Sequence, residues 1–285
     1  MAIGFKREEL KARYDVKDMR EDDWHTYSGQ KTAALLARHL SPPMNSSRWL
    51  LNAGAGIYEV CRSPWKEVAL DLFIAPILSR KYAVCASVER LPFQAGTFGG
   101  IVCVGEVLAY CDPATAITEF ARLLAPSGIL ICDFSNSCSF RYWFEAAYGR
   151  AADLITEKYN GTPERTWVYG PTYVKSILLS SGFTIKAQSG THTWSALARR
   201  IGASIPVALF LQRRLEWLRL PARWADLTTI VAVRAGAGRE SQQKAFLRSP
   251  YLPQGSAVQR RQEQTAPMTK CSPSSAGRQA TQQSQ

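Results

Sequence analysis

The sequence predicts an α/β protein with a doubly wound, mostly parallel sheet of about seven strands. Two observations lead to this fold class. Short runs of continuous apolar residues, such as "GIVCVG" at 100–105 and "ILICDFS" at 129–135, are typical of strands that are covered on both faces. Segments with helical periodicity, such as 113–125, lie between these runs. Alternating strands and helices form parallel sheets with helices on both sides.

The segment before the first strand is expected to be helical. "SGQKTAALLARHL" carries Ala34, Leu35 and Leu36 as apolar surface, with Ser28 as a cap and prolines 42 and 43 after its end. Together with the residues before it, this helix predicts an N-terminal helical lid over residues 1–46.

Apolar segments then predict the strands of the main domain, residues 47–234, in chain order: 49–53 ("WLLNA"), 67–73, 82–87, 100–105, 129–135, 184–190 and 226–234. Two helices separate the later strands. One covers 113–125 and begins with a proline in its first turn, and the other covers 171–183 and ends at a glycine.

A long, partly helical insertion at 195–223 carries much of the positive charge of the domain. Six arginines lie between Arg199 and Arg223, against the single acid Glu216. A solvated helix face is one interpretation, and attraction to an anionic substrate or membrane surface is the other. No aromatic platform or recognised module accompanies the charge, so nucleic-acid binding is not expected.

Composition limits the remaining classes. Seven cysteines without a CxxC pair or a histidine cluster predict reduced thiols in the cytoplasm and no metal site. The charged N-terminus lacks the apolar run of a signal peptide, and the longest apolar run, 205–211, is too short to cross a bilayer. Residues 235–285, with ten glutamines and seven serines, predict a disordered tail. Nothing in the sequence predicts the oligomeric state.

The stretch "WLLNAGAGIYEV" predicts a ligand-binding loop. In a doubly wound sheet, ligands bind beyond the carboxyl ends of the strands, and Gly54 and Gly56 follow the first strand there. Asp71 ends the second strand, where a carboxylate can accept hydrogen bonds from a ribose diol. The combination predicts a cofactor that contains a nucleoside.

Five segments in this order resemble the class I S-adenosylmethionine-dependent methyltransferases, in particular the branch that acts on small molecules. They are "NAGAGIY", "LDLF", "ERLPF" at 89–93, "GEVLAYCDP" at 105–113 and "ARLLAPSGILI" at 121–131. The last strand, in "WADLTTIVAVR", is also similar to that family. The resemblance implies a Rossmann-like fold, S-adenosylmethionine as cofactor, and a small-molecule or glycan acceptor.

The resemblance also implies a set of cofactor-binding residues at the carboxyl ends of the first four strands: Asn52, Gly54, Gly56, Asp71, Leu72, Ser87, Val88, Gly105 and Glu106. Asp71 would hold the ribose hydroxyls. Ser87 and Val88 would contact the adenine, with Leu72 and Leu91 on its ring face. The cofactor and the acceptor would meet at residues 105 and 106.

Several substitutions, two of them in the first loop, depart from the family pattern and leave alternatives open. Asn52 replaces the usual acid of the first loop, and Tyr58 replaces its third glycine. The chain is therefore either an active methyltransferase or a methyltransferase-like binding module without catalysis. An NAD(P)-dependent oxidoreductase is a third hypothesis, but its fingerprint needs a glycine where Glu59 stands.

Methyl transfer to a hydroxyl benefits from a general base. The candidates are His25 in the lid, His192 after the sixth strand and Asp133 at the end of the fifth. The aromatic-rich segments 139–148 and 165–171 are either a wall of the acceptor pocket or core. A fainter similarity, in "EDDWHTYSGQ" and "NGTPERTWVYGP", is to bacterial enzymes that 2-O-methylate the fucose of lipochitooligosaccharide nodulation signals.

Overall fold

The computed structural model describes residues 23–40, 49–60, 65–159, 162–218 and 220–236. All of them belong to the first of two compact units, Met1–Phe246. The predicted disordered tail, except for residues 235 and 236, lies outside the described residues, as does the first part of the predicted lid.

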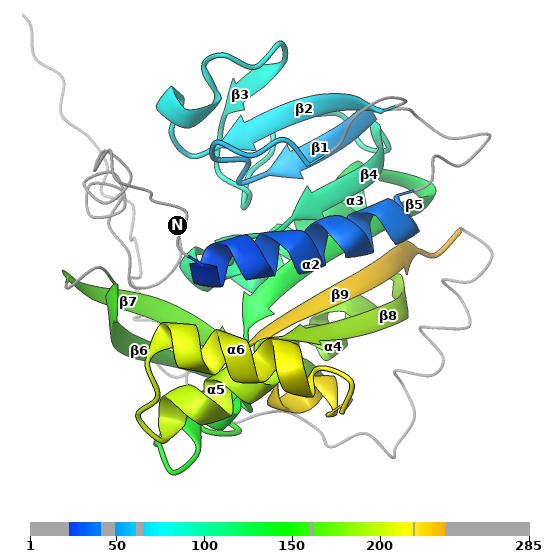
Figure 1. Ribbon diagram of the computed structural model, residues 1–285. Coiled ribbons are helices and arrows are strands. Elements are labelled where there is room, and N and C mark those ends of the chain that lie inside the picture. Colours follow the sequence, from blue (N-terminus) through cyan, green and yellow to red (C-terminus); the bar gives the residue numbers. More distant parts are fainter. Residues whose placement is uncertain (1–22, 41–48, 61–64, 160–161, 219, 237–285) are drawn as a thin grey trace, which may run out of the picture. The chain divides into compact units, whose positions relative to one another are not determined.

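Seven strands form one sheet in the order β3-β2-β1-β4-β5-β9-β8 (Figure 1). Their bounds are Trp49–Ala53 for β1, Lys66–Asp71 for β2, Ala83–Cys85 for β3, Phe98–Cys103 for β4, Leu124–Ser135 for β5, Phe183–Thr191 for β8 and Leu227–Arg234 for β9. The first five strands pair in parallel, and β9 is antiparallel to both β5 and β8. The predicted mostly parallel seven-stranded sheet is confirmed. Strand order reverses between β1 and β4, so a crevice for ligands is expected at their carboxyl ends.

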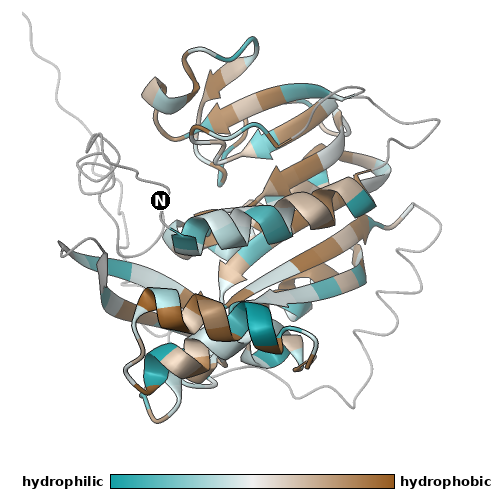
Figure 2. Cartoon of the chain, in the orientation of Figure 1, coloured by the Kyte–Doolittle hydropathy of each residue, from teal (hydrophilic) through white to brown (hydrophobic). Residues whose placement is uncertain are grey.

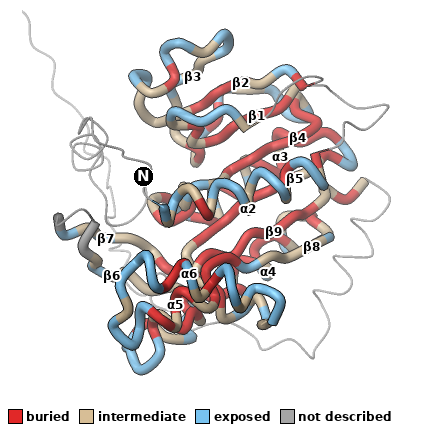
Figure 3. The backbone as a smooth tube through the Cα atoms, in the orientation of Figure 1, coloured by how far each residue is buried: buried red, intermediate tan, exposed pale blue. Residues whose placement is uncertain are grey.

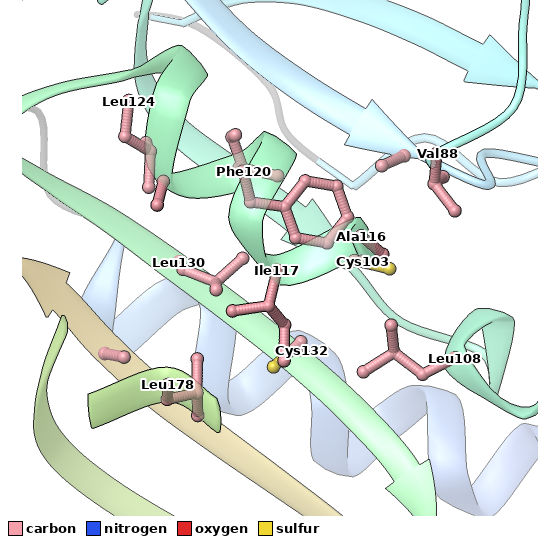
Figure 4. Close-up of a cluster of buried hydrophobic side chains, with 14 of the residues drawn as sticks. Val88, Cys103, Leu108, Ala116, Ile117, Phe120, Leu124, Leu130, Cys132 and Leu178 are labelled. Atoms are coloured by element: carbon pink, nitrogen blue, oxygen red, sulfur yellow. The ribbon is translucent and has the colours of Figure 1, made fainter. Parts of the chain in front are cut away.

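Helices α3 (Pro113–Leu123) and α4 (Pro171–Ser180) cover one face of this sheet. Figure 4 shows Ile117 and Phe120 of α3 and Leu178 of α4 packed beside Leu130 and Cys132 of β5. These side chains are fully buried, which accounts for the continuous apolar character of the strands. The central strands are buried along most of their length (Figure 3).

Helix α2 (Asp23–His39) covers the opposite face. Leu36 and Leu40 belong to a buried cluster with apolar residues of β1, β4, β5 and β9, and the indole of Trp65 donates to the Leu40 carbonyl at 2.8 Å. Ser28, which was expected to cap this helix, lies inside it. Its hydroxyl donates to the Trp24 carbonyl at 3.2 Å, which is the usual local hydrogen bond of a serine inside a helix.

Two elements were not predicted as they occur. Strands β6 (Ala152–Tyr159) and β7 (Thr162–Tyr169) form a separate antiparallel hairpin between β5 and α4. The basic insertion forms helices α5 (Thr193–Arg200) and α6 (Ile205–Leu215) and a short 3-10 turn, Ala222–Trp224. The insertion therefore begins two residues earlier than expected, and it is helical over most of its length.

Candidate cofactor and acceptor site

The loop after β1 is fixed against β2 and against the next loop along the crevice. The backbone amides of Gly54 and Ala55 both donate to the Leu70 carbonyl, at 2.8 and 2.9 Å. Gly54 has φ +77°, and a Cβ there would lie 2.2 Å from Cγ2 of Val107, at the start of the 3-10 helix η2 (Val107–Tyr110). Only glycine allows this close approach between the loop after β1 and the loop after β4.

The structure brings the predicted residues Gly56 and Asp71 together. One carboxylate oxygen of Asp71 accepts from the Gly56 amide at 2.9 Å, and the other accepts from the Phe73 amide at 3.0 Å. Gly56 has φ +49°, and no atom lies within 4 Å of the position of a Cβ. A half-buried carboxylate therefore borders open space, and it keeps lone pairs that can accept from a ribose diol. These features fit a nucleoside-containing cofactor.

Asn52 holds the loop from inside the protein. Its side chain is 2% exposed, and its amide nitrogen donates to the Tyr58 carbonyl at 3.0 Å and to Glu67 at 2.9 Å. The amide that replaces the family's acid thus stabilises the end of the loop through a carboxylate on β2. Sequence reasoning missed Glu67, because its contact with Asn52 depends on the pairing of β1 with β2.

No helix follows this loop in the described residues 54–60. Arg80 stabilises the extended segment instead: its guanidinium donates to the Ile57 carbonyl at 3.0 Å and pairs with Glu59 at 2.5 Å. Tyr58, which occupies the position of the third glycine, is 46% exposed. A tyrosine is therefore tolerated there without any loss of packing.

The residues predicted to contact adenine lie after β2 and β3. Ser87 and Leu72 are partly exposed, and the Ser87 hydroxyl accepts from the Glu89 amide at 3.2 Å. Val88 and Leu91 are buried in the main core, at 8% and 4% exposure. Their side chains therefore support this end of the site from within the core.

The loop after β4 is held by Asp133, which is 1% exposed. Its two carboxylate oxygens accept from the amides of Gly105 and Glu106, at 3.0 and 2.9 Å. Burial raises the pKa of Asp133 to about 7, against the opposing effect of these two hydrogen bonds. Gly105 and Glu106 are both in the left-handed region, with φ +83° and +63°, and the Ser135 hydroxyl donates to the Glu106 carboxylate. The predicted residues 105, 106 and 133 thus form one unit.

Beside Glu106 lies a charged cluster that sequence reasoning missed. Arg141 donates to Glu157 of β6 at 2.7 Å and pairs with Asp226 at 3.4 Å, and the Tyr142 hydroxyl donates to the same Glu157 at 2.8 Å. Burial raises the pKa of Glu157, and the nearby charge of Glu106 adds to this effect. We call Arg141, Tyr142, Glu157 and Asp226 the acceptor-side cluster. Its one sequence signal was the aromatic-rich segment 139–148.

The predicted catalytic histidines lie in different surroundings. His192 is 1% exposed, stacks on Trp24 with ring centroids 3.7 Å apart, and has its ring nitrogens 2.7 Å from the Ser28 hydroxyl and 3.0 Å from that of Ser195. His192 thereby connects α2 to α5. His25 is exposed on α2. Their predicted catalytic roles stay predictions.

Among the residues that the structure describes, no group of three or more histidine, cysteine or acidic side chains is arranged to hold a metal ion. In the same part of the chain, every helix is too short or too polar to cross a membrane.

A family model described as a methyltransferase domain matches residues 46–132. The fold is similar to that of a protein from Listeria monocytogenes described as an S-adenosylmethionine-dependent methyltransferase, with 14% identity, a TM-score of 0.53, and coverage of 73% of this chain and 99% of that chain. It is also similar to PH0226 from Pyrococcus horikoshii OT3, with 15% identity, a TM-score of 0.51, and coverage of 81% and 100%. A comparison with curated proteins found no match.

At such low identity, the solved structures show the fold alone. The family model and the fold together confirm the expected resemblance to class I S-adenosylmethionine-dependent methyltransferases, and S-adenosylmethionine as the cofactor. Residues 46–132 therefore match a methyltransferase domain, and the acceptor has to be argued from the residues of the site.

Proposed function

We propose that this protein is an active enzyme that transfers the methyl group of S-adenosylmethionine to a hydroxyl of a small-molecule or glycan acceptor. The observation that carries the proposal is the hydrogen bond between the Gly56 amide and the Asp71 carboxylate, beside open space at the carboxyl end of β1. Asp71 would accept from the ribose hydroxyls, and Gly54 and Gly56 would let the backbone approach the methionine portion. When bound, the cofactor supplies an electrophilic methyl group on a sulfonium.

The acceptor-side cluster supports a hydroxyl-bearing acceptor. Arg141, Tyr142 and Glu157, with Glu106 and Ser135 nearby, offer both donors and acceptors at the carboxyl ends of β4 and β5. A sugar presents alternating hydroxyls that donate and accept in the same way. A purely apolar acceptor would bury the remaining donor and acceptor positions of these groups without partners, which is costly.

Within this proposal, Glu106 accepts the proton of the acceptor hydroxyl. It is partly exposed, it follows β4 where cofactor and acceptor would meet, and Asp133 fixes its backbone in a left-handed conformation. Asp133 uses both oxygens for this purpose, so we assign it a positioning role. His192, buried between two hydroxyls, would position the lid helix α2 in the same way.

The finer proposal is 2-O-methylation of a fucose on a lipochitooligosaccharide nodulation signal, in the cytoplasm. It depends on the similarity of "EDDWHTYSGQ" and "NGTPERTWVYGP" to such enzymes. The second segment contains β7, whose Glu164 accepts from the Tyr110 hydroxyl after β4. The described cysteines are all free thiols, in keeping with a reducing compartment.

Two measurements on the full chain test the proposal. Calorimetric titration with S-adenosylmethionine is expected to give saturable binding, and incubation with isotope-labelled cofactor and fucosylated oligosaccharides is expected to give a product one methyl group heavier. Glu106→Gln should lower the rate of transfer far more than it lowers the affinity for the cofactor. Absence of cofactor binding would contradict the proposed methyltransferase activity. Binding without transfer to any hydroxyl acceptor would favour a non-catalytic module.

A further inference from the structure

Helix α6 contacts the rest of the protein through a small and partly polar face. Its buried residues are Ala208, Leu209 and Gln212. The Gln212 carbonyl accepts from the backbone amides of Trp194 and Ser195, at 2.9 and 3.1 Å, and so fixes α6 on the start of α5. Little apolar surface of α6 is therefore used within the fold.

The opposite face of α6 presents larger apolar side chains to solvent. Val207, Phe210, Arg214 and Trp217 follow each other at intervals of three and four residues, which places them along one side of the helix and the turn after it. Val207 is 50% exposed, Phe210 58% and Trp217 75%. Figure 2 shows the first turns of α6 as hydrophobic and its end as hydrophilic. A surface helix ordinarily has the reverse arrangement, with its large apolar residues against the core.

Positive charge borders this outward face. Arg213 and Arg214 are exposed, and the Arg214 guanidinium lies 5.5 Å from the ring centre of Phe210. Glu216, the one acid of the segment, pairs with Lys31 of α2. None of the described residues forms an ion pair with Arg213 or Arg214. The face therefore combines exposed aromatic rings with exposed arginines.

We propose that the outward face of α6 docks onto an anionic phospholipid surface. Exposed tryptophan and phenylalanine side chains enter the headgroup region of a bilayer, and arginines beside them bind lipid phosphates. A second copy of the chain is a poorer occupant, because symmetric pairing would bring the arginines of both copies together. The helix would lie in the plane of the membrane surface.

Co-sedimentation with vesicles tests this proposal on the full chain. Vesicles that contain phosphatidylglycerol are expected to bind the protein, and pure phosphatidylcholine vesicles to bind it far less. Phe210→Ser and Trp217→Ser should each lower the partition coefficient about tenfold, since each removes an aromatic side chain that would be buried in the headgroup region of the bilayer. The double variant R213Q/R214Q should reduce the preference for the anionic vesicles by about fivefold for each arginine.

Leu78→Ser is the matched control, because Leu78 is 73% exposed on the segment that connects β2 to β3, at the other end of the sheet. It should bind vesicles like the wild type. All variants keep the basic tail, so binding through the tail alone would be equal in all of them. Equal binding by Phe210→Ser and wild type would overturn the proposal. A dimer that Phe210→Ser abolishes, measured by light scattering, would also overturn it in favour of self-association.

Discussion

The proposed site has a cofactor half, formed by the loops after β1 and β2, and an acceptor half, formed by the acceptor-side cluster with Tyr110 and Glu164 beside it. The two halves are held together over very different distances along the chain. In the cofactor half, the hydrogen bond from Gly56 to Asp71 joins residues 15 apart, and that from Phe73 to Asp71 joins residues two apart. In the acceptor half, Arg141 reaches Asp226 across 85 residues and Tyr110 reaches Glu164 across 54. The hydrogen bonds that shape the cofactor half are therefore local, whereas those of the acceptor half form only when distant parts of the chain have folded together.

This difference indicates which residues of each half can be substituted. A local loop depends on a few backbone conformations, so that single glycines and one carboxylate are decisive there. A cluster assembled from three separate segments can change its acceptor by altering side chains while the sheet stays the same. The boundary between the halves is the loop after β4, which Asp133 fixes.

The largest expected effect is at this boundary and depends on pH. The pKa of Asp133 is raised from 3.8 to about 7 in the folded protein. The stability that its protonated form contributes is therefore fully present below pH 4 and is lost as the pH rises through about 7, a change of up to about 4 kcal/mol. Asp133→Asn cannot titrate. Denaturant unfolding at several pH values should show the destabilisation by this variant shrinking between about pH 4 and 7 and staying constant above that, and a difference that is constant throughout would refute the assignment.

The next effect tests whether the cofactor half depends on single backbone positions. Gly54→Ala should lower the free energy of unfolding by about 3 kcal/mol. The alanine would have to adopt the left-handed backbone conformation of Gly54, and its Cβ would clash with Val107. Gly56→Ala is the control: it meets open space and should cost only about 1 kcal/mol. The double change Gly54→Ala/Val107→Ala should recover part of the loss. Equal destabilisation by the two glycine variants would mean that contact with the β4 loop is unimportant.

A third prediction concerns cofactor affinity. Asp71→Ala should weaken S-adenosylmethionine binding about a hundredfold, because charge-assisted hydrogen bonds to the ribose are lost. Asp71→Asn keeps one accepting oxygen and should show an intermediate affinity in calorimetric titration. Glu157→Gln, in the acceptor half, should bind the cofactor like the wild type. A folded Asp71→Ala protein with unchanged affinity for S-adenosylmethionine would refute the hypothesis that Asp71 binds the ribose.

The difference in sequence separation between contacting residues also explains which features the sequence could predict. The apolar strands, the glycines after β1, Asp71 after β2 and the amphipathic helix at 113–125 are all local patterns, and the structure has them at the expected places. The acceptor-side cluster has no local pattern, since Arg141 and Glu157 are 16 residues apart and Asp226 lies 69 residues beyond Glu157. Only the fold brings these charges together.

Two misses had different causes. The hairpin of β6 and β7 pairs Tyr159 with Thr162, which leaves Asn160-Gly161 between the strands, a dipeptide that strongly favours two-residue turns. That signal was in the sequence and was overlooked. The role of Asn52 could not have been predicted, because an isolated asparagine after a strand does not reveal that its amide will reach Glu67 on the neighbouring strand.

The smallest expected effect is on binding of the acceptor. Glu157→Gln keeps the shape of the side chain and can still accept from Arg141 and Tyr142, but it removes the charge that balances Arg141. Once an acceptor is identified, its KM should rise about tenfold, the scale of one weakened charge-assisted hydrogen bond, while the Kd for S-adenosylmethionine stays unchanged. Glu145→Gln, which alters an exposed ion pair with Arg200, is the matched control and should change neither constant. If Glu157→Gln altered the cofactor Kd instead, the two halves would be coupled through Glu106, and the division between a local cofactor half and a distant acceptor half would not hold.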